Sequence, residues 1–512
     1  MAATASPTAI GALWAALENL PQPPLTALFA HPARLERYAS VLDLPGGPIR
    51  FDWSKTHLSP DVDAVLGQIA DAADLAGRRA ALFAGEAINN TEGRAATHAA
   101  ERGIGNPAAA EEAALFHERM RALVEAIHEG LLGEVKSLIH IGIGGSALGP
   151  ALGIDALARE DARVAVHVVS NIDGAALAAA VKQCDPATTL IAVASKTFTT
   201  TETLVNAVSA LDWLREGGVE DPYGRVVALT AAPDKAVAWG VDETRVLPFA
   251  ETVGGRYSLW SSIGFPIALA LGWDGFAAFL AGAAAIDSHF LEAPIAENVV
   301  IRAAFADLYY TQARGCASRA VFAYDERLRL LPSYLQQLEM ESNGKRVTAD
   351  GAPLTRPSAP VTWGGTGTDA QHAVFQLLHQ GTHLIPVDFL AVSIPGHDFD
   401  PAHHRILLAN CFAQGAALMA GKAGGDDMAR DYPGNRPSAT ILCDELGAAT
   451  LGSLIAFHEH RTFVSAIMLG INPFDQFGVE LGKAMAKAMD DEGGARFDAS
   501  TEALLAAAGI DR

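Results

Sequence analysis

The chain has little cysteine, and what it has is widely spaced. Its four cysteines form no CxxC pair and no dense framework: Cys184, Cys316, Cys411 and Cys443. Disulfide scaffolds are typical of small secreted domains, whereas isolated thiols are typical of larger proteins in reducing compartments. The spacing therefore predicts buried, reduced thiols.

Basic residues are scarce relative to acidic ones. Lys and Arg number 37 against 59 Asp and Glu, which gives a formal net charge of −22. Broad binding to nucleic acid or to an anionic membrane needs a basic surface. We therefore expect no nucleic-acid and no membrane partner, and any anionic ligand must be met by a local positive site.

Long hydrophobic runs are also missing. The most apolar stretch, 263–273, is interrupted by Gly and Pro and falls short of the roughly 20 residues that a membrane span needs. The first basic residue is Arg34, so the opening segment has no charged start of a secretory signal. These features predict a cytoplasmic protein.

Sequence motifs for metals and nucleotides are lacking as well. Residues 458–460 read HEH, which is not the HExxH zinc motif, and His397, His403 and His404 have no partners at ligand spacing. There is no GxxxxGK[ST] loop, which disfavours a P-loop sugar kinase. We expect no metal and no cofactor.

The chain does contain a strong α/β pattern. Its 512 residues exceed what one core usually organises, so two or more domains are expected. Short β runs alternate with Ala/Leu-rich helices, which predicts parallel sheets covered by helices. The expected strands are 137–143, 164–170, 188–194 and 225–230, then 320–324, 361–363 and 384–390.

A glycine-rich segment, IGIGGSALG, occupies residues 141–149 between an expected strand and a helix. Glycines let a ligand approach the backbone, and a helix start offers free N–H groups to an anion. A sugar phosphate is favoured over a dinucleotide, because the next strand reaches Asp173 only beyond its end. A purely structural turn stays open.

A hydroxyl-rich segment, SKTFTTTET, follows another expected strand at 195–203. Its hydroxyls and Lys196 suit a phosphate dianion at a helix start. The alternative is simple helix capping, because Ser/Thr-x-x-Glu is also a capping pattern.

The segment QQLEMESNGK, 336–345, is expected to be a short helix. Gln337 and Glu341 lie four apart and so share a face, and Gly344 follows as a helix end. A carboxylate can take a proton from a carbon next to a carbonyl. An exposed, functionless Glu remains the ordinary alternative.

Three further side chains suit acid–base or charge chemistry. His372 carries the side-chain type that commonly exchanges protons in catalysis, Lys483 can donate a proton, and Arg256 in a glycine turn can oppose an oxyanion. A structural histidine, a solvated lysine and a structural ion pair are the respective alternatives.

Taken in order, these segments resemble the glucose-6-phosphate isomerase family, from GEAINNTEGRAATH (85–98) to FDQFGVELGK (474–483). The resemblance implies two sugar isomerase (SIS) domains, each an α/β/α sandwich around a parallel sheet, in a homodimer with shared active sites. Its implied divisions are an N-terminal helical arm 1–41, a smaller domain 107–272, a larger domain 42–106 with 273–488, and a C-terminal tail 489–512.

The resemblance also implies roles for individual residues. Glu341 would move the proton between C1 and C2 of the sugar through a cis-enediol(ate), with Arg256 opposing the charge, and His372 and Lys483 would open the ring. Gln337 would also line the reacting end. The implied phosphate cradle consists of Gly145, Ser146, Ser195, Lys196, Thr197 and Thr200.

Three local departures from the family pattern stand out. Ala147 replaces a common Asp, Leu338 and Glu339 replace a Gly-Asp pair, and Gly365 with Thr366 replaces Glu-Pro. None removes an expected catalytic side chain. A non-catalytic sugar-phosphate-binding protein and a dehydrogenase remain the rival interpretations; the first would not need Glu341, and the second would need a nicotinamide site.

Overall fold

The computed structural model describes residues 7–490 and 497–510. The chain forms two units, residues 1–473 and 474–512. Part of the expected arm 1–41 and part of the expected tail 489–512 lie outside the described residues. The domain divisions stay predictions, and the expected end of the helical arm at residue 41 lies inside a strand, Ala39–Leu44.

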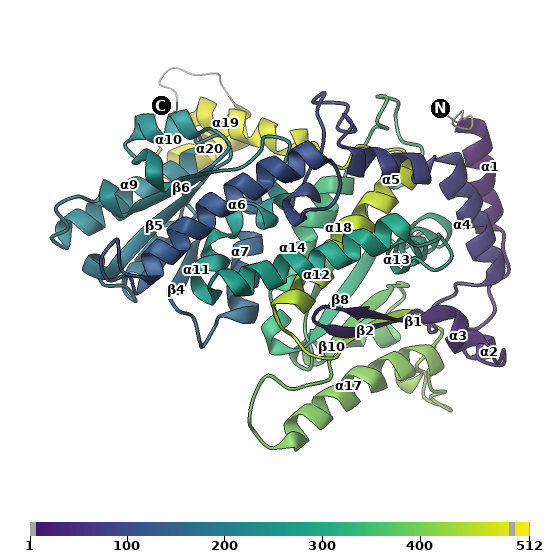
Figure 1. Cartoon of the computed structure of the whole chain (residues 1–512). Helices are drawn as coiled ribbons and strands as arrows, with labels where there is room; N and C mark the ends of the chain where they lie inside the picture. The colour runs from purple at the N-terminus through teal and green to yellow at the C-terminus, as the bar shows by residue number, and fades with distance from the viewer. Residues whose placement is uncertain (1–6, 491–496, 511–512) are drawn as a thin grey trace. The chain divides into compact units, whose positions relative to one another are not determined.

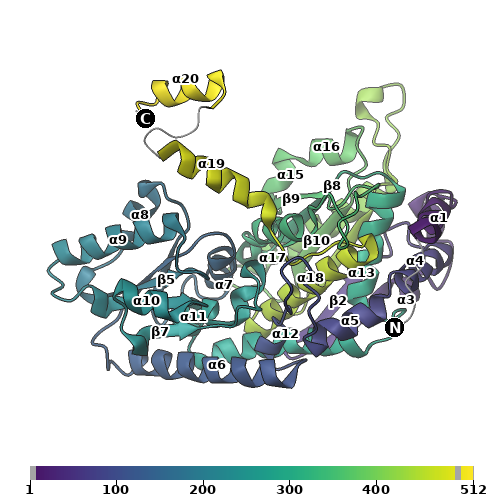
Figure 2. The same cartoon turned by 90° about the horizontal axis from the view of Figure 1, so that it is seen from above.

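A five-stranded, fully parallel sheet lies in one half of the first unit (Figure 1). Its order is β4-β3-β5-β6-β7, with β3 (Ser137–Ile141), β4 (Ala165–Val169), β5 (Thr189–Ala194), β6 (Val226–Thr230) and β7 (Val246–Pro248). One face packs on α8 (Gly174–Val181), α9 (Thr201–Glu216) and α10 (Pro233–Trp239). Figure 2 shows α6 (Pro107–His128) along the opposite side.

A six-stranded mixed sheet lies in the other half, in the order β1-β2-β11-β10-β8-β9. Its strands are β1 (Ala39–Leu44), β2 (Gly47–Asp52), β8 (Ser318–Tyr324), β9 (Val361–Thr366), β10 (Val387–Val392) and β11 (Ser438–Cys443). The core on one face includes α15 (Asp369–Ala373), α16 (Phe375–Gln380) and α17 (Pro401–Ala420). The N-terminal hairpin pairs antiparallel with β11, and the other neighbours are parallel.

Helices also connect and cover the two halves of the first unit. Near the N-terminus lie α1 (Pro7–Glu18), α2 (Leu25–Leu28), α3 (Arg34–Tyr38), α4 (Pro60–Ala72) and α5 (Leu75–Ala84). Further along are α7 (Leu148–Leu157), α11 (Phe265–Leu271), α12 (Trp273–Glu292), α13 (Val299–Leu308), α14 (Leu331–Gln336) and α18 (Ala448–Leu469). The long helices α12 and α18 pack against each other. The second unit contains α19 (Glu480–Asp490) and α20 (Ala499–Ala507).

The α/β fold with parallel-core sheets is confirmed, and every expected strand is present with shifted ends. The strand expected at 137–143 ends at Ile141, because Gly142 begins the turn, and the one expected at 384–390 begins only at Val387. The strand expected at 361–363 continues to Thr366. Four strands, β1, β2, β7 and β11, were not expected.

The HEH segment lies in the middle of α18 with all three side chains buried. Glu459 accepts hydrogen bonds from Arg102 and Trp260, at 2.7 and 2.8 Å, and His460 bonds to Asp287 at 2.5 Å. Burial is the main cause that raises the pKa of Glu459 to about 7. Among the described residues, no group of three or more His, Cys, Asp or Glu side chains is placed to hold a metal ion. Within the same residues, no helix is long and apolar enough to cross a membrane.

Candidate active site

The two expected phosphate turns lie side by side. The first, Gly144–Ser146, follows β3, and the second, residues 195–200, follows β5. Because β3 and β5 are neighbouring parallel strands, their carboxyl ends meet at one edge of the sheet. Open parallel sheets bind ligands at this edge. The sheet topology thus brings together Gly145, Ser146, Ser195, Lys196, Thr197 and Thr200.

A buried histidine, which was not predicted from the sequence, hydrogen-bonds to the first turn. His140, on β3, donates from Nε2 to the Ser146 carbonyl at 2.7 Å. Burial lowers the pKa of His140 to about 4, so the ring is neutral at neutral pH. The donated hydrogen bond fixes the backbone of the turn that carries Ser146.

The hydroxyl-rich segment does not serve as a simple helix cap. Thr200 is the residue before α9, but its side chain makes no capping hydrogen bond. Its hydroxyl instead pairs with that of Ser195 at 3.0 Å, and the hydroxyls of Thr197 and Thr199 pair at 2.8 Å. The arrangement leaves hydroxyl groups gathered at a helix start, which suits an anion.

Lys196 ties the second turn to the chain that leads to Arg256. Its Nζ donates to the backbone carbonyls of Glu251 and Val253, at 2.6 and 2.9 Å. Burial, helped by the charge of Arg94, lowers the pKa of Lys196 to about 8. The ammonium is therefore still mostly charged at neutral pH, and it carries positive charge into this edge of the sheet.

The glycine turn is packed directly against the turn that carries Arg256. A Cβ atom at Gly145 would lie 2.2 Å from the carbonyl of Gly255 and 2.6 Å from the amide nitrogen of Arg256. A Cβ atom at Gly144, whose φ is +56°, would lie 3.0 Å from Nε2 of Gln337. Gly145 is needed because the backbone of the Arg256 turn approaches it closely, and Gly144 lies beside the end of the Gln337 side chain.

Gln337 and Glu341 lie on a turn that is wider than the expected helix. Residues Gln337–Glu341 form a π-helical segment directly after α14. A π-helical turn has i→i+5 hydrogen bonds in place of the i→i+4 bonds of the expected helix, and the prediction that the two side chains share a face stays a prediction. Such segments are frequent at functional sites.

Arg256 and Glu341 face each other. Nη1 of Arg256 lies 3.7 Å from Oε1 of Glu341, and the side chains are 2% and 21% exposed. Nε of Arg256 donates to the Ser342 hydroxyl at 2.7 Å, and Nη2 donates to the Pro473 carbonyl at 2.5 Å. The guanidinium is fixed, and the carboxylate retains access from outside.

Ser342 and Tyr257 complete this corner, and the sequence reasoning missed both. The Tyr257 hydroxyl lies 2.9 Å from the Ser342 hydroxyl, and its ring stacks on His98 with centroids 4.7 Å apart. Both residues flank a predicted functional residue, which was the only available signal. Their contacts join the Arg256 turn to the π-helical segment.

The remaining two predicted residues are His372 and Lys483. His372 is exposed on α15, and its side chain makes no hydrogen bond or ion pair within the described residues. Lys483 lies on α19, which belongs to the second unit. Their roles stay predictions.

The fold and the site together define a class: an α/β protein with parallel-core sheets, in which a sheet edge rich in hydroxyl and backbone donors is combined with a carboxylate and a guanidinium, an arrangement suited to acid–base chemistry on an anionic ligand. The sequence profile described as phosphoglucose isomerase matches residues 52–505. The chain belongs to the phosphoglucose isomerase family.

Known proteins resemble the chain along nearly its whole length. It is 78% identical over 497 residues to a glucose-6-phosphate isomerase of Novosphingobium aromaticivorans, covering 97% of this chain and 98% of that one. A glucose-6-phosphate isomerase of Zymomonas mobilis is 58% identical over 509 residues, with 99% and 100% covered. The crystal structure of a glucose-6-phosphate isomerase from Chlamydia trachomatis matches with a TM-score of 0.88 at 27% identity, covering 98% of both chains.

Proposed function

We propose that the chain catalyses the reversible interconversion of glucose 6-phosphate and fructose 6-phosphate. The observation that carries the proposal is the Arg256–Glu341 pair, 3.7 Å apart, beside the glycine turn. A carboxylate can act as the base for a carbon acid, and a fixed guanidinium can stabilise the oxyanion that results. Family membership and the relatives' names favour this reaction over a non-catalytic binding role.

The reaction would proceed in two stages. His372 and Lys483 move protons to and from the ring oxygen and the anomeric hydroxyl, which opens the cyclic sugar. Glu341 then removes the proton from C2 and returns it to C1 through a cis-enediol(ate). Arg256 opposes the negative charge that develops on the oxygen atoms, and Gln337 holds a hydroxyl group at the same end.

The phosphate supplies binding energy far from the reacting carbons. We assign the cradle to Gly145, Ser146, Ser195, Lys196, Thr197 and Thr200. Their hydroxyl groups, backbone N–H groups and one ammonium match a phosphate dianion. Remote binding of this kind positions C1 and C2 against the base and so lowers the barrier.

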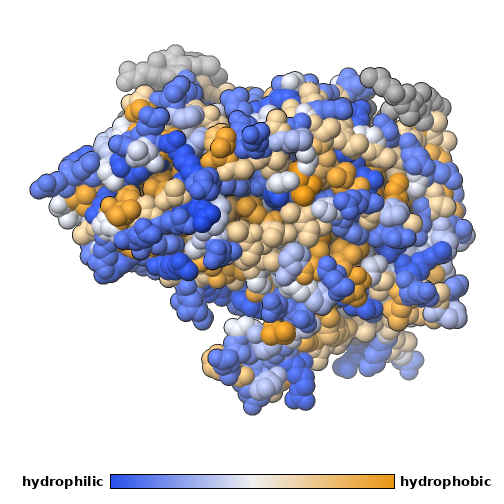
Figure 3. Space-filling model, viewed as in Figure 1, coloured by the Kyte–Doolittle hydropathy of each residue, from blue (hydrophilic) through white to orange (hydrophobic). Residues whose placement is uncertain are grey.

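The resemblance further leads us to propose a homodimer in which His372 completes the partner's site. We also propose that each chain is divided into the two domains and two terminal segments named above. Exposed apolar side chains on and around α17 give the dimer some support: Ile394, Phe399, Ile406 and Phe412 are all at least 45% exposed. Figure 3 shows hydrophobic residues among hydrophilic ones in this lower region. We place the protein in the cytoplasm.

Shared sites can be tested by complementation. Glu341→Gln and His372→Ala chains are dissociated together and reassembled, which makes half of the dimers mixed. About a quarter of wild-type activity should return, because each mixed dimer has one intact site. Tagged mixed dimers with no activity above the parents would show that His372 does not serve the partner's site.

The proposed reaction has a direct test. Purified, chelator-treated protein is given fructose 6-phosphate, and the formation of glucose 6-phosphate is followed, with Glu341→Gln as the matched control. We expect turnover in the first and little in the second. Binding of the sugar phosphate without turnover in the wild-type protein would favour the non-catalytic alternative.

A further inference from the structure

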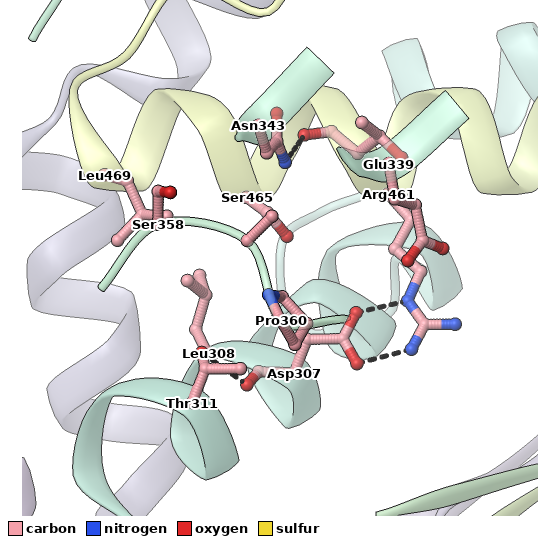
Figure 4. A pocket seen from close by; sticks show the side chains of 12 residues that line it. Asp307, Leu308, Thr311, Glu339, Asn343, Ser358, Pro360, Arg461, Ser465 and Leu469 are labelled. Carbon is pink, nitrogen blue, oxygen red and sulfur yellow. Dashed lines mark hydrogen bonds and ion pairs between the residues drawn. The ribbon is translucent and has the colours of Figure 1, made fainter. Parts of the chain in front are cut away.

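A small pocket lies behind the π-helical segment that carries Glu341 (Figure 4). Glu339 lines it from that segment, Asn343 lines it from the residues just after the segment, and Asp307, Arg461 and Thr311 line it from neighbouring helices. Its volume of about 30 Å³ holds a water molecule or two but not a sugar. The pocket is therefore not a ligand site, and its charged walls need another explanation.

Glu339 is the charged group of the π-helical segment that points into the protein. The residue is 7% exposed, forms an ion pair with Arg319 of β8, and accepts a hydrogen bond of 2.6 Å from the Thr362 hydroxyl of β9. Burial acts to raise the pKa of Glu339, but Arg319 and Arg461 outweigh it and keep the pKa below its usual value. Glu339 is thus ionised and bound to two strands of the six-stranded sheet.

The partners of Glu339 are themselves fixed. Asp388 accepts from Arg319 at 2.5 Å and from Arg461 at 2.7 Å. Asp307 accepts from Arg461 at 2.5 Å, and Figure 4 shows the two groups side by side. The cluster of Arg319, Arg461, Glu339, Asp307 and Asp388 joins β8, β10, α13 and α18 to the π-helical segment.

The residues just after Glu341 are anchored as well. Ser342 is held by Arg256 and Tyr257, and Asn343 donates to the Thr462 carbonyl at 3.0 Å. Glu339, Ser342 and Asn343 are buried, while Gln337 and Glu341 are partly exposed. The buried side chains of this stretch are therefore bonded into the protein, while Gln337 and Glu341 face the candidate site. Glu339 is the charged member of the buried set, and it precedes Glu341 in the chain.

We propose that Glu339 is a positioning residue for Glu341: its bonds to Arg319 and Thr362 hold the π-helical turn so that the Glu341 carboxylate faces Arg256 and the reacting carbons. The inference rests on the proposed isomerase function and extends it to a residue that touches no substrate. A shift of about 1 Å in a catalytic group can cost on the order of 10²-fold in rate. The phosphate cradle lies on other segments, so substrate binding should change little.

The test compares variants by turnover, KM and thermal midpoint. Glu339→Gln keeps the shape but loses the charge, and we expect kcat to fall about 10- to 10²-fold while KM stays within about twofold of the wild type. Glu339→Asp restores the charge and should recover part of the loss. Thr362→Val, which removes a single hydrogen bond, should lower kcat by a smaller factor and decides the question if Glu339→Gln does not fold.

Asp388→Asn is the matched control, because it removes a negative charge that faces the same Arg319, and also Arg461, without changing a residue of the π-helical segment. It should lower the thermal midpoint as much as Glu339→Gln does but leave kcat far closer to wild type. Equal losses of kcat in the two variants would overturn this inference, and so would an unchanged kcat in folded Glu339→Gln or Thr362→Val. Either result would leave the proposed function standing. An inactive wild-type protein would overturn the proposed function and this inference with it.

Discussion

The candidate site has two ends, the proposed phosphate end and the proposed reacting end, and different interactions hold them in place. At the phosphate end, the turns after β3 and β5 meet by close approach of backbone, with Gly145 against Gly255 and His140 beneath Ser146. At the reacting end, Arg256 and Glu341 face each other as an ion pair, and Glu339, two residues before Glu341, forms a buried ion pair with Arg319. The first end should therefore be sensitive to added volume, and the second to a change of charge.

The contributions of the two ends are distinguished most clearly by removing a charge at the reacting end. Glu341→Gln should lower kcat by on the order of 10² to 10⁴, the usual contribution of a positioned base. Binding of a reduced sugar phosphate that lacks the carbonyl should be nearly unchanged, because the phosphate end is intact. Steady-state kinetics and titration calorimetry measure both; a variant with more than about a tenth of wild-type turnover would refute the role of Glu341.

Added volume should break the phosphate end. Gly145→Ala places a methyl group 2.2 Å from the Gly255 carbonyl, so the glycine turn and the Arg256 turn must move apart. We expect kcat/KM to fall about 10²-fold through this displacement. Gly255→Ala is the control, because its added Cβ meets no heavy atom within 4 Å, and it should lose far less. Similar losses in both variants would contradict the close-approach argument.

Single hydroxyl groups at the phosphate end should matter less. Ser195→Ala or Thr197→Ala removes one hydrogen bond to a charged ligand, which is worth about 1.5 to 3 kcal/mol. The dissociation constant of the reduced sugar phosphate should rise by at least about tenfold, and kcat should change little. Unchanged affinity in both variants would exclude the hydroxyl-rich turn from the cradle.

The smallest expected effect is a pH dependence of binding. The pKa of Lys196 is lowered to about 8 by burial, so the ammonium is charged below that pH and neutral above it. The phosphate ester is a dianion throughout the range from pH 7 to 9. Affinity should therefore fall as pH rises past 8, by no more than about tenfold per pH unit. Lys196→Met should bind more weakly at pH 7 and lose this slope, and a slope that survives would assign it to another group.

Local sequence patterns were enough for most of the parallel strands, but not for β7 and β11, and for the turns that follow β3 and β5. β3 and β5 are short, mostly apolar runs followed directly by Gly142 and Ser195, and both features are local. The missed strands lack this signal. β7 has three residues, and the exposed positions of β1 interrupt its apolar pattern. Their pairing partners decide that they are strands.

The site residues divide in the same way. Glu341 and Arg256 were found because they stand in distinctive motifs, and the structure brings them within 3.7 Å. Glu339 was noted only as a departure from the family pattern, because a lone glutamate on a helix is normally solvated. Its partners Arg319 and Thr362 come from other strands, and no local spacing predicts that three such residues meet in the core.

The pairing of β2 with β11 constrains how the chain is made. In this antiparallel pair, Phe51 lies opposite Ile441. Because the two residues are far apart in the chain, the N-terminal hairpin is synthesised early and its partner strand β11 is synthesised near the end. At typical translation rates, roughly 20 to 80 seconds separate the two strands. Throughout that time the hairpin has an open edge, which is a template for wrong pairing with other chains. The five-stranded sheet, whose strands all lie between residues 137 and 248, can form in the meantime on the ribosome, whereas the six-stranded sheet must wait for the last quarter of the message.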